Sequence, residues 1–290
     1  MSTSRPVARI VTAHQQTEGG GFVVRRPFPT AGLSLVDPFL LLDEMGPVDY
    51  PPGEAIGAPD HPHRGFETVT YILEGETEHE DSAGHRGAIG AGDVQWMTAG
   101  SGVVHSEMPS RRIREQGGRV HGFQIWVNLP RSDKLMSPRY QEISGARIPT
   151  GRSADGLAEV RVVAGEALGA RAVIETRTPI YLQDWTLRPG ARVSVPLPAE
   201  HQASLYVFGG EARVGDRRIT DGQLALLGAG DAVEMAVPAD ATAPARLLLL
   251  SGVPLREPVA RYGPFVMNTP EEIRQAIVDF QAGRMGEIRR

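Results

Sequence analysis

The amino-acid sequence predicts an all-β fold with two similar β domains. Proline and glycine separate runs of about four to eight residues in which apolar and polar side chains alternate, as in β-sandwiches and barrels. A weak internal repeat gives the same order of turns and strands twice. The length of 290 residues is enough for two domains or one large domain with a substantial core.

The repeat sets the expected domain organisation. A glycine–glutamate turn, a hairpin and a Gly-Ala-Gly-Asp turn follow one another over residues 74–94 and again over residues 209–233. The stretch from Pro130 to about Gly156 contains proline and serine and reads as the connection. We therefore expect a first domain over residues 1–135 and a second over residues 136–290.

One helix is expected near the end of the second domain. Thr269 and Glu272 form a capping box with a proline at the first helical position, so a helix should cover residues 270–282. Its apolar stripe should pack against the chain's own β domains; the stripe consists of Ile273, Ile277 and Phe280.

Two short motifs carry the candidate chemistry. His61 and His63 stand two residues apart, and so do His105 and Glu107. Only an extended strand directs side chains at positions i and i+2 to the same face. If the two strands are neighbours, three imidazoles and a carboxylate converge, which suits a first-row transition ion.

The pattern after the first motif suggests a further carboxylate. Every second residue from His61 includes His63 and Glu67 and then becomes apolar, so Glu67 is expected on the same strand face. Pro62 cannot donate a ladder hydrogen bond, which places the pair at a strand start or rim where an open coordination position is reachable.

The remaining histidines are weaker candidates, since a single histidine is more often a surface or core residue than a ligand. His14 and His201 are expected to be exposed, and His79 and His85 to flank a hairpin tip. Whether His121 lines the pocket without ligating is left open.

The second repeat lacks the ligand pairs. Transferring the two motifs onto it leads to Pro196–His201 and to the neighbourhood of Ala243 and Ala245, where neither pair occurs. One metal ion per chain is therefore expected.

Composition narrows the function classes. A net charge of −5 without a lysine or arginine block argues against direct nucleic-acid binding, and three nearby arginines read as a solvated loop (Arg111, Arg112 and Arg114). The absence of cysteine excludes disulfides and thiolate ligands. No apolar stretch of about 20 residues and no secretory leader are visible, so a cytoplasmic protein without membrane contact is expected.

Longer segments resemble the pirin family of bicupins: DPFLLLDEM, HPHRGFETVTY, GDVQWMTAGSGVVHSEMP, HGFQIWVNLP and GPFVMNTPEEI. The resemblance implies two cupin β-barrels packed face to face and one divalent metal ion, usually Fe²⁺, without an organic cofactor. We expect the protein to be a monomer. The family's metal ligands match His61, His63, His105 and Glu107. In many other cupins the carboxylate ligand stands where this chain has Glu67, which leaves Glu67 a supporting place beside the site.

The resemblance also implies a chemistry. Bacterial pirins resemble quercetin 2,3-dioxygenases, which cleave a flavonol with O2 and release carbon monoxide. Glu107 or Glu67 would then accept the hydroxyl proton of the substrate, and the candidate apolar walls are Phe66, Trp96, Met97 and Phe123.

Two alternatives stay open at this point. One is a metal- or redox-dependent regulatory protein that binds a transcription factor or a metabolic enzyme without turnover. The other is a metal-binding cupin with a substrate that is not a flavonol.

Overall fold

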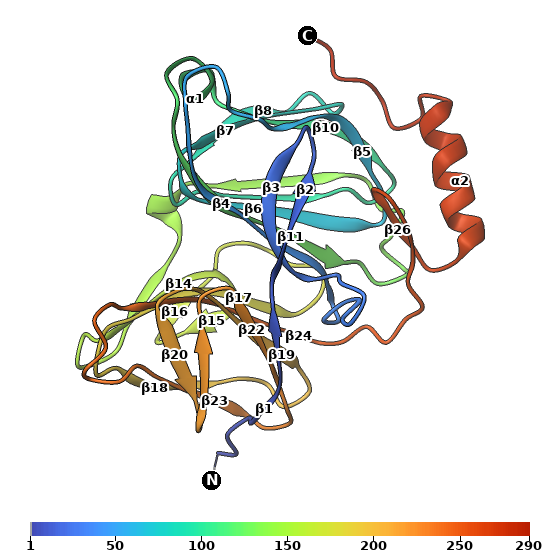
Figure 1. The fold of residues 1–290 in the computed structure, drawn as a ribbon. Coiled ribbons are helices and arrows are strands. Elements are labelled where there is room, and N and C mark those ends of the chain that lie inside the picture. Colours follow the sequence, from blue (N-terminus) through green and yellow to red (C-terminus); the bar gives the residue numbers. More distant parts are fainter. Residues whose placement is uncertain (1) are drawn as a thin grey trace. The chain divides into compact units, whose positions relative to one another are not determined.

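The computed structural model describes residues 2–290 and is mostly β, with two helices (Figure 1). Contacts divide the chain into two compact units. The unit that we call the His unit contains Gln15–Pro29, Phe39–Ala146 and Leu255–Arg290. The second unit contains residues 2–14, Thr30–Pro38 and Arg147–Pro254.

The compact units interleave along the chain, whereas the expected division has a single boundary after residue 135. The hydrogen bonding of the chain's end segments accounts for the difference. Strand β1 (Val7–Thr12) pairs with β22 (Gln223–Leu227) in the second unit. In the His unit, the amide of Val266 donates to the carbonyl of Arg64 at 3.1 Å.

The two large sheets of the His unit are both antiparallel. Seven strands form one sheet in the order β12-β9-β6-β11-β4-β3-β2, and four form the other in the order β5-β10-β7-β8. The bounds are β2 (His14–Glu18), β3 (Phe22–Phe28), β4 (Phe39–Tyr50), β5 (Ala58–His63), β6 (Phe66–Glu74), β7 (Glu76–Asp81), β8 (Arg86–Gly90), β9 (Val94–Thr98), β10 (Val103–Pro109), β11 (Gly118–Asn128) and β12 (Arg139–Ile143).

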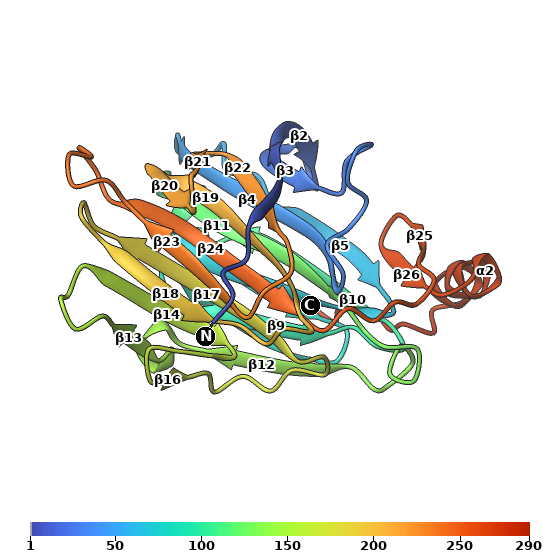
Figure 2. The same ribbon diagram turned by 90° about the horizontal axis from the view of Figure 1, so that it is seen from below.

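The predicted helix is present as α2 (Pro270–Gln281), with the capping box between Thr269 and Glu272 complete. Figure 2 shows it beside the hairpin of β25 (Ala260–Tyr262) and β26 (Phe265–Met267). Ile273 packs in a core cluster with Phe265 and Met267, whereas Phe280 at the end of the stripe is 41% exposed.

A second, shorter helix is a correction to the sequence analysis. The arginines expected in a loop lie instead in α1 (Arg111–Gln116), because the side chain of Ser110 accepts a hydrogen bond from the amide of Ile113 and caps the first turn. Within residues 2–290, no helix is long and apolar enough to cross a membrane.

The second unit repeats the two-sheet arrangement, with sheet orders β1-β22-β19-β24-β17-β14-β13 and β18-β23-β20-β21. Its bounds are β13 (Thr150–Arg152), β14 (Ala158–Ala164), β15 (Glu166–Ala167), β16 (Ala170–Arg171), β17 (Ile180–Leu187), β18 (Arg192–Pro196), β19 (Gln202–Gly209), β20 (Glu211–Val214), β21 (Arg217–Thr220), β23 (Ala232–Ala236) and β24 (Ala245–Gly252). Its core is almost entirely aliphatic around Trp185.

Matching sheet orders identify the strands of the second unit that correspond to the histidine strands. Strands β18 and β23 take the places that β5 and β10 take in the His unit. They contribute Val195, Val233 and Met235 to the apolar core of the second unit. The counterpart of the His61 and His63 strand is therefore β18, which ends where the expected stretch Pro196–His201 begins. Neither β18 nor β23 carries a histidine.

Candidate metal centre

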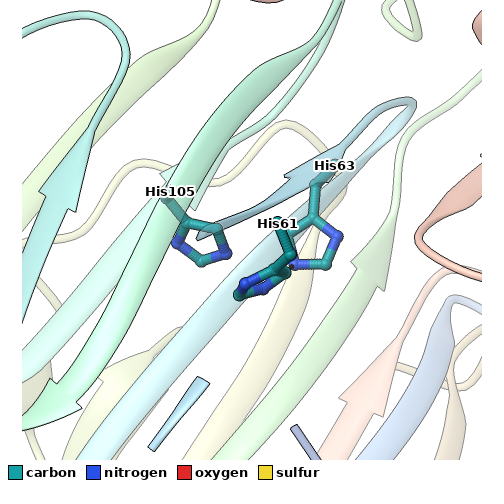
Figure 3. A group of neighbouring side chains, drawn as sticks. All are labelled: His61, His63 and His105. Carbon is teal, nitrogen blue, oxygen red and sulfur yellow. Dashed lines mark hydrogen bonds between the residues drawn. The ribbon is translucent and has the colours of Figure 1, made fainter. Parts of the chain in front are cut away.

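Three histidine side chains converge on one point of the His unit. Strands β5 and β10 are antiparallel neighbours, with His61 directly opposite His105. The ring centroid of His105 lies 4.3 Å from that of His61 and 4.9 Å from that of His63. One ring nitrogen of each histidine lies within 4.8 Å of the other two, and Figure 3 shows the rings turned toward one another.

The surroundings of His63 and His105 favour the neutral form that binds metal. His63 and His105 are 3% and 1% exposed. Burial, followed by the neighbouring histidine rings, lowers the pKa of both imidazoles well below the usual value of 6.5. A neutral imidazole keeps a lone pair for a metal ion.

Backbone carbonyls orient two of the rings. The Nδ1 atom of His61 donates to the carbonyl of Pro59 at 2.7 Å, and that of His63 to the carbonyl of Pro264 at 3.3 Å. These bonds leave the Nε2 atoms of both rings facing each other at 3.1 Å. Metal-binding histidines characteristically donate their other ring nitrogen in this way.

The surroundings of the third ring, that of His105, show whether these residues fit a metal ion. Neither ring nitrogen of His105 has a hydrogen-bond partner among residues 2–290, although both are buried. A buried polar atom without a partner is costly. Three nitrogen donors without a thiolate suit a first-row divalent ion with open positions, so the residues fit the ion that the sequence predicts.

Glu107 lies close to this triad in a different arrangement from the one expected. The register of β10 against β5 shifts between His105 and Glu107. The Oε1 atom of Glu107 accepts a hydrogen bond of 2.5 Å from the hydroxyl of Thr70. Its carboxylate lies within 4.8 Å of donor atoms of His105 and His79, and the place of Glu107 as the fourth ligand stays a prediction.

The expectation that Glu67 shares a strand face with the histidines is wrong. His63 ends β5, and Glu67 lies in β6, which belongs to the other sheet. Gly65 between them has a φ of +89°, and a Cβ there would collide with the carbonyl of Val266. The chain therefore bends at Gly65, and the period of two does not continue through it.

Glu67 faces away from the site. It is paired with Thr98 of β9, and its Oε1 atom accepts a hydrogen bond of 2.6 Å from the hydroxyl of Thr98. Thr70 lies three residues after Glu67 and therefore on the opposite face of β6, where it contacts Glu107. A catalytic part for Glu67 stays a prediction that these contacts do not support.

A cavity of about 610 Å³ in the His unit opens onto the candidate centre. Its lining includes His61, His63 and Glu107, together with Thr70 and Gln124. Trp126 lines it as well, and the ring of His63 meets Trp126 edge-on at 5.2 Å between centroids.

None of the four expected wall residues is part of this lining. Trp96 and Phe123 are paired with the residues of β6 that share the Glu67 face, so they point away from the cavity. Phe66 packs behind Trp126 with Leu40, and Met97 packs against Tyr140. Trp126 was not among the expected wall residues, although it alternates with Gln124 along one strand face.

One side of the cavity is charged. Arg26 makes two hydrogen bonds of 2.5 Å to the carboxylate of Asp43 and an ion pair of 2.8 Å with Glu18. Burial raises the pKa of Asp43 to about 6, although Arg26 opposes the shift. Arg261 lies with its guanidinium carbon 4.6 Å from the ring centre of Trp126.

Lys134 ties the strand bend beside His63 to the segment that follows residue 255. Its ammonium group donates to the carbonyl of Gly65 at 2.8 Å, the carbonyl of Val266 at 3.2 Å and the side chain of Asn128 at 2.7 Å. Burial lowers the pKa of Lys134 to about 8. The residue is 1% exposed.

An ion pair makes a second connection. Arg64 donates to the carboxylate of Asp279 in α2 at 2.6 Å and to the carbonyl of Ser101 at 2.6 Å. The residue next to His63 is therefore held to both α2 and the loop that precedes β10.

The other histidines occupy varied places. His121 is buried beside Glu44, 2.9 Å from its Oε1 atom, and does not line the cavity. His201 was expected to be exposed but is buried, 3.0 Å from the hydroxyl of Ser251. His85 is exposed in the turn that joins β7 and β8, as expected.

His79 is the most informative correction. It was expected near a hairpin tip, yet it is 1% exposed in β7 and directly opposite Glu107 of β10. Its burial follows from that pairing, which places it inside the unit beside His105.

Comparison with known proteins identifies the family. Residues 21–127 match the family model described as Pirin, and residues 182–286 match the Pirin C-terminal cupin domain. The chain belongs to the pirin family. The predictions of a pirin and of a mostly β bicupin fold with a C-terminal helix are confirmed.

Relatives of this pirin carry different names. The human protein named pirin is 44% identical over 293 residues, covering 99% of this chain and 96% of the relative. A crystal structure titled quercetin 2,3-dioxygenase from Acinetobacter baumannii is 37% identical, with a TM-score of 0.92 and coverage of 99% and 100%.

A more distant likeness supports the fold alone. The bacterial pirin from Escherichia coli, solved in complex with nickel(II), has a TM-score of 0.64 at 21% identity, with coverage of 85% of this chain and 99% of that one.

Proposed function

We propose that this protein is a metal-dependent dioxygenase that cleaves flavonols such as quercetin with O2 and releases carbon monoxide. The observation that carries the proposal is the group of three converging imidazoles, which lies beside a carboxylate and a cavity of about 610 Å³. The Acinetobacter relative named as a quercetin 2,3-dioxygenase supports it.

The proposed ligands of the ion are His61, His63 and His105, with Glu107 as the fourth. The absence of thiolates and the open side toward the cavity favour a first-row ion that keeps exchangeable positions, and we propose Fe²⁺. When bound, the ion supplies the Lewis acidity and electron transfer that allow O2 to react with a deprotonated flavonol.

Glu107 is the proposed proton acceptor for the 3-hydroxyl group of the substrate. Its carboxylate lines the cavity, whereas that of Glu67 faces the other side of its sheet. The hydroxyl of Thr70 donates to the Oε1 atom of Glu107 at 2.5 Å and so helps to orient the carboxylate at the cavity.

Trp126 supplies a flat apolar wall for a planar ring system, with Arg261 against its ring. One flavonol and one O2 are consumed for each carbon monoxide and each depside formed. This balance needs no reductant and no organic cofactor.

The test compares wild-type protein with Glu107→Ala at matched total iron, because free metal ions speed flavonol autoxidation. Carbon monoxide is measured directly, and His14→Ala, an exposed histidine far from the motifs in sequence, is the matched control. The proposal requires carbon monoxide from wild type and the control, with a large loss in Glu107→Ala. Equal release from all three, or none from any, removes it.

The family resemblance leaves a second candidate, a regulatory protein whose metal state changes the affinity for a protein partner. This candidate predicts no turnover of any flavonol. It also predicts that a captured partner binds the oxidised and reduced forms of the metal-loaded protein with different affinities. Measurement of both affinities separates the two functions.

A further inference from the structure

The interior of the His unit contains buried polar groups that the proposed function does not use. His79 is 1% exposed, and neither of its ring nitrogens has a hydrogen-bond partner within the described chain. The hydroxyl of Tyr140 is also buried without a hydrogen-bond partner among residues 2–290, and the ring centroid of Tyr140 lies 5.1 Å from that of His79. Buried polar groups in native proteins are usually satisfied by protein, water or an ion.

The strand register directs His79 toward two residues of the candidate centre. In the pairing of β7 with β10, His79 stands opposite Glu107, and Asp81 stands opposite His105. The ring centroids of His79 and His105 are 5.2 Å apart. One donor atom each from His79, His105 and Glu107 lies within 4.8 Å of the others.

A carboxylate stands behind His79. The Nε2 atom of His79 lies 3.7 Å from Oδ2 of Asp81, which is itself buried and is held by the ring of His85 at 2.9 Å. A carboxylate behind a histidine is the arrangement that orients metal-binding imidazoles in many proteins. Two imidazoles and a carboxylate are ligands that first-row divalent ions accept.

We propose that His79, His105 and Glu107 form a second ligand set for a divalent first-row ion, an inner position that lies on the β7 side of the histidine triad. The proposal concerns ion binding and does not depend on the dioxygenase activity. Because His105 belongs to both sets, the inner and outer positions are alternatives for one ion per chain. His79 is then a metal ligand that the His61 and His63 motif does not reveal.

The experiment uses Co²⁺ as the probe, because its visible absorption reports the ligand set. The 290-residue chain is prepared without metal in four forms. They are wild type, the double variant His61→Ala/His63→Ala, the triple variant that adds His79→Gln to the double variant, and a control that adds His14→Ala to it instead. Circular dichroism and thermal unfolding establish that each form is folded before titration.

The inner position predicts that the double variant retains one Co²⁺ per chain, with a visible spectrum that differs from the wild-type spectrum. The triple variant should lose that ion, and the His14→Ala control should keep it. The proposal is overturned if the double variant binds no Co²⁺, or if adding His79→Gln leaves its binding and spectrum unchanged.

Partial unfolding of the triple variant would leave that comparison ambiguous, so a second measurement avoids the replacement of His79. In the folded double variant, saturating Co²⁺ should shift the ring proton signals of His79 far outside the normal range through paramagnetism. Signals that stay in the normal range at full Co²⁺ occupancy contradict the inner position.

Discussion

His61 and His105 lie directly opposite each other across β5 and β10, with ring centroids 4.3 Å apart. The antiparallel register of two strands therefore brings together ligands that are more than forty positions apart in the sequence. A slip by one residue would send one partner to the other face of the sheet. The candidate centre depends on this register more than on any loop.

The first prediction concerns His105, which belongs to both ligand sets. His105→Ala should abolish stoichiometric binding of divalent ions, whereas His63→Ala should weaken it. Metal analysis of protein dialysed against a defined free-ion concentration measures both. His14→Ala is the control, and full occupancy in His105→Ala would contradict the ligand assignment.

The second prediction separates the two glutamates. Glu67→Gln should keep the ion, because Glu67 faces away from the centre and bonds to Thr98. The change weakens a buried hydrogen bond to a charged acceptor, so the free energy of unfolding should fall by about 1–3 kcal/mol.

Metal content and denaturant unfolding of Glu67→Gln give the two readouts. Loss of the ion in a folded Glu67→Gln protein would show that Glu67 reaches the centre after all. Glu107→Gln, tested in parallel, should lower carbon monoxide release with a smaller effect on unfolding.

The third prediction concerns the ion pair between Arg64 and Asp279. Asp279→Ala removes the carboxylate partner of Arg64, whose side chain is largely buried, and leaves the carbonyl of Ser101 as an acceptor. The segment around β26 should then open more often, and the amide of Val266, which donates to Arg64, should exchange its hydrogen faster. Hydrogen exchange measures this, with Glu271→Ala on the exposed side of α2 as the control.

The fourth prediction uses the pKa of Lys134, which burial lowers from 10.5 to about 8. Between these values the unfolded state holds a proton that the folded state has released, so stability should rise with pH. The unfolding free energy of wild type, measured relative to that of Lys134→Met, should therefore rise by up to about 3 kcal/mol from pH 8 to 10.5. A constant difference across that range would mean that the lysine keeps an ordinary pKa in the fold.

Alternation along strands made much of the site predictable. The paired motifs lie in β5 and β10, and the β fold and capped α2 helix were also visible in the sequence. Period-two counting failed at Gly65, because the counting assumes one continuous strand and the backbone bends there with a φ of +89°. Glu67 was therefore assigned to the wrong face.

His79 could not be found in the same way. Strand β7 consists entirely of polar residues, so no alternation marks its inward face. Only the pairing with β10 shows that His79 and Asp81 point inward. The local sequence does not predict which distant strands pair with each other. Trp126 was detectable in principle, because it follows Gln124 at a spacing of two on β11.

The interleaving of the two units has a consequence for how the protein is made. During synthesis, residues 39–146 leave the ribosome well before residues 255–290 exist, yet both belong to the same compact unit. The carbonyls of Pro264 and Val266, which hold His63 and Lys134, arrive only with this last segment. The nascent His unit therefore lacks these two backbone acceptors until translation has passed through the whole of the second unit.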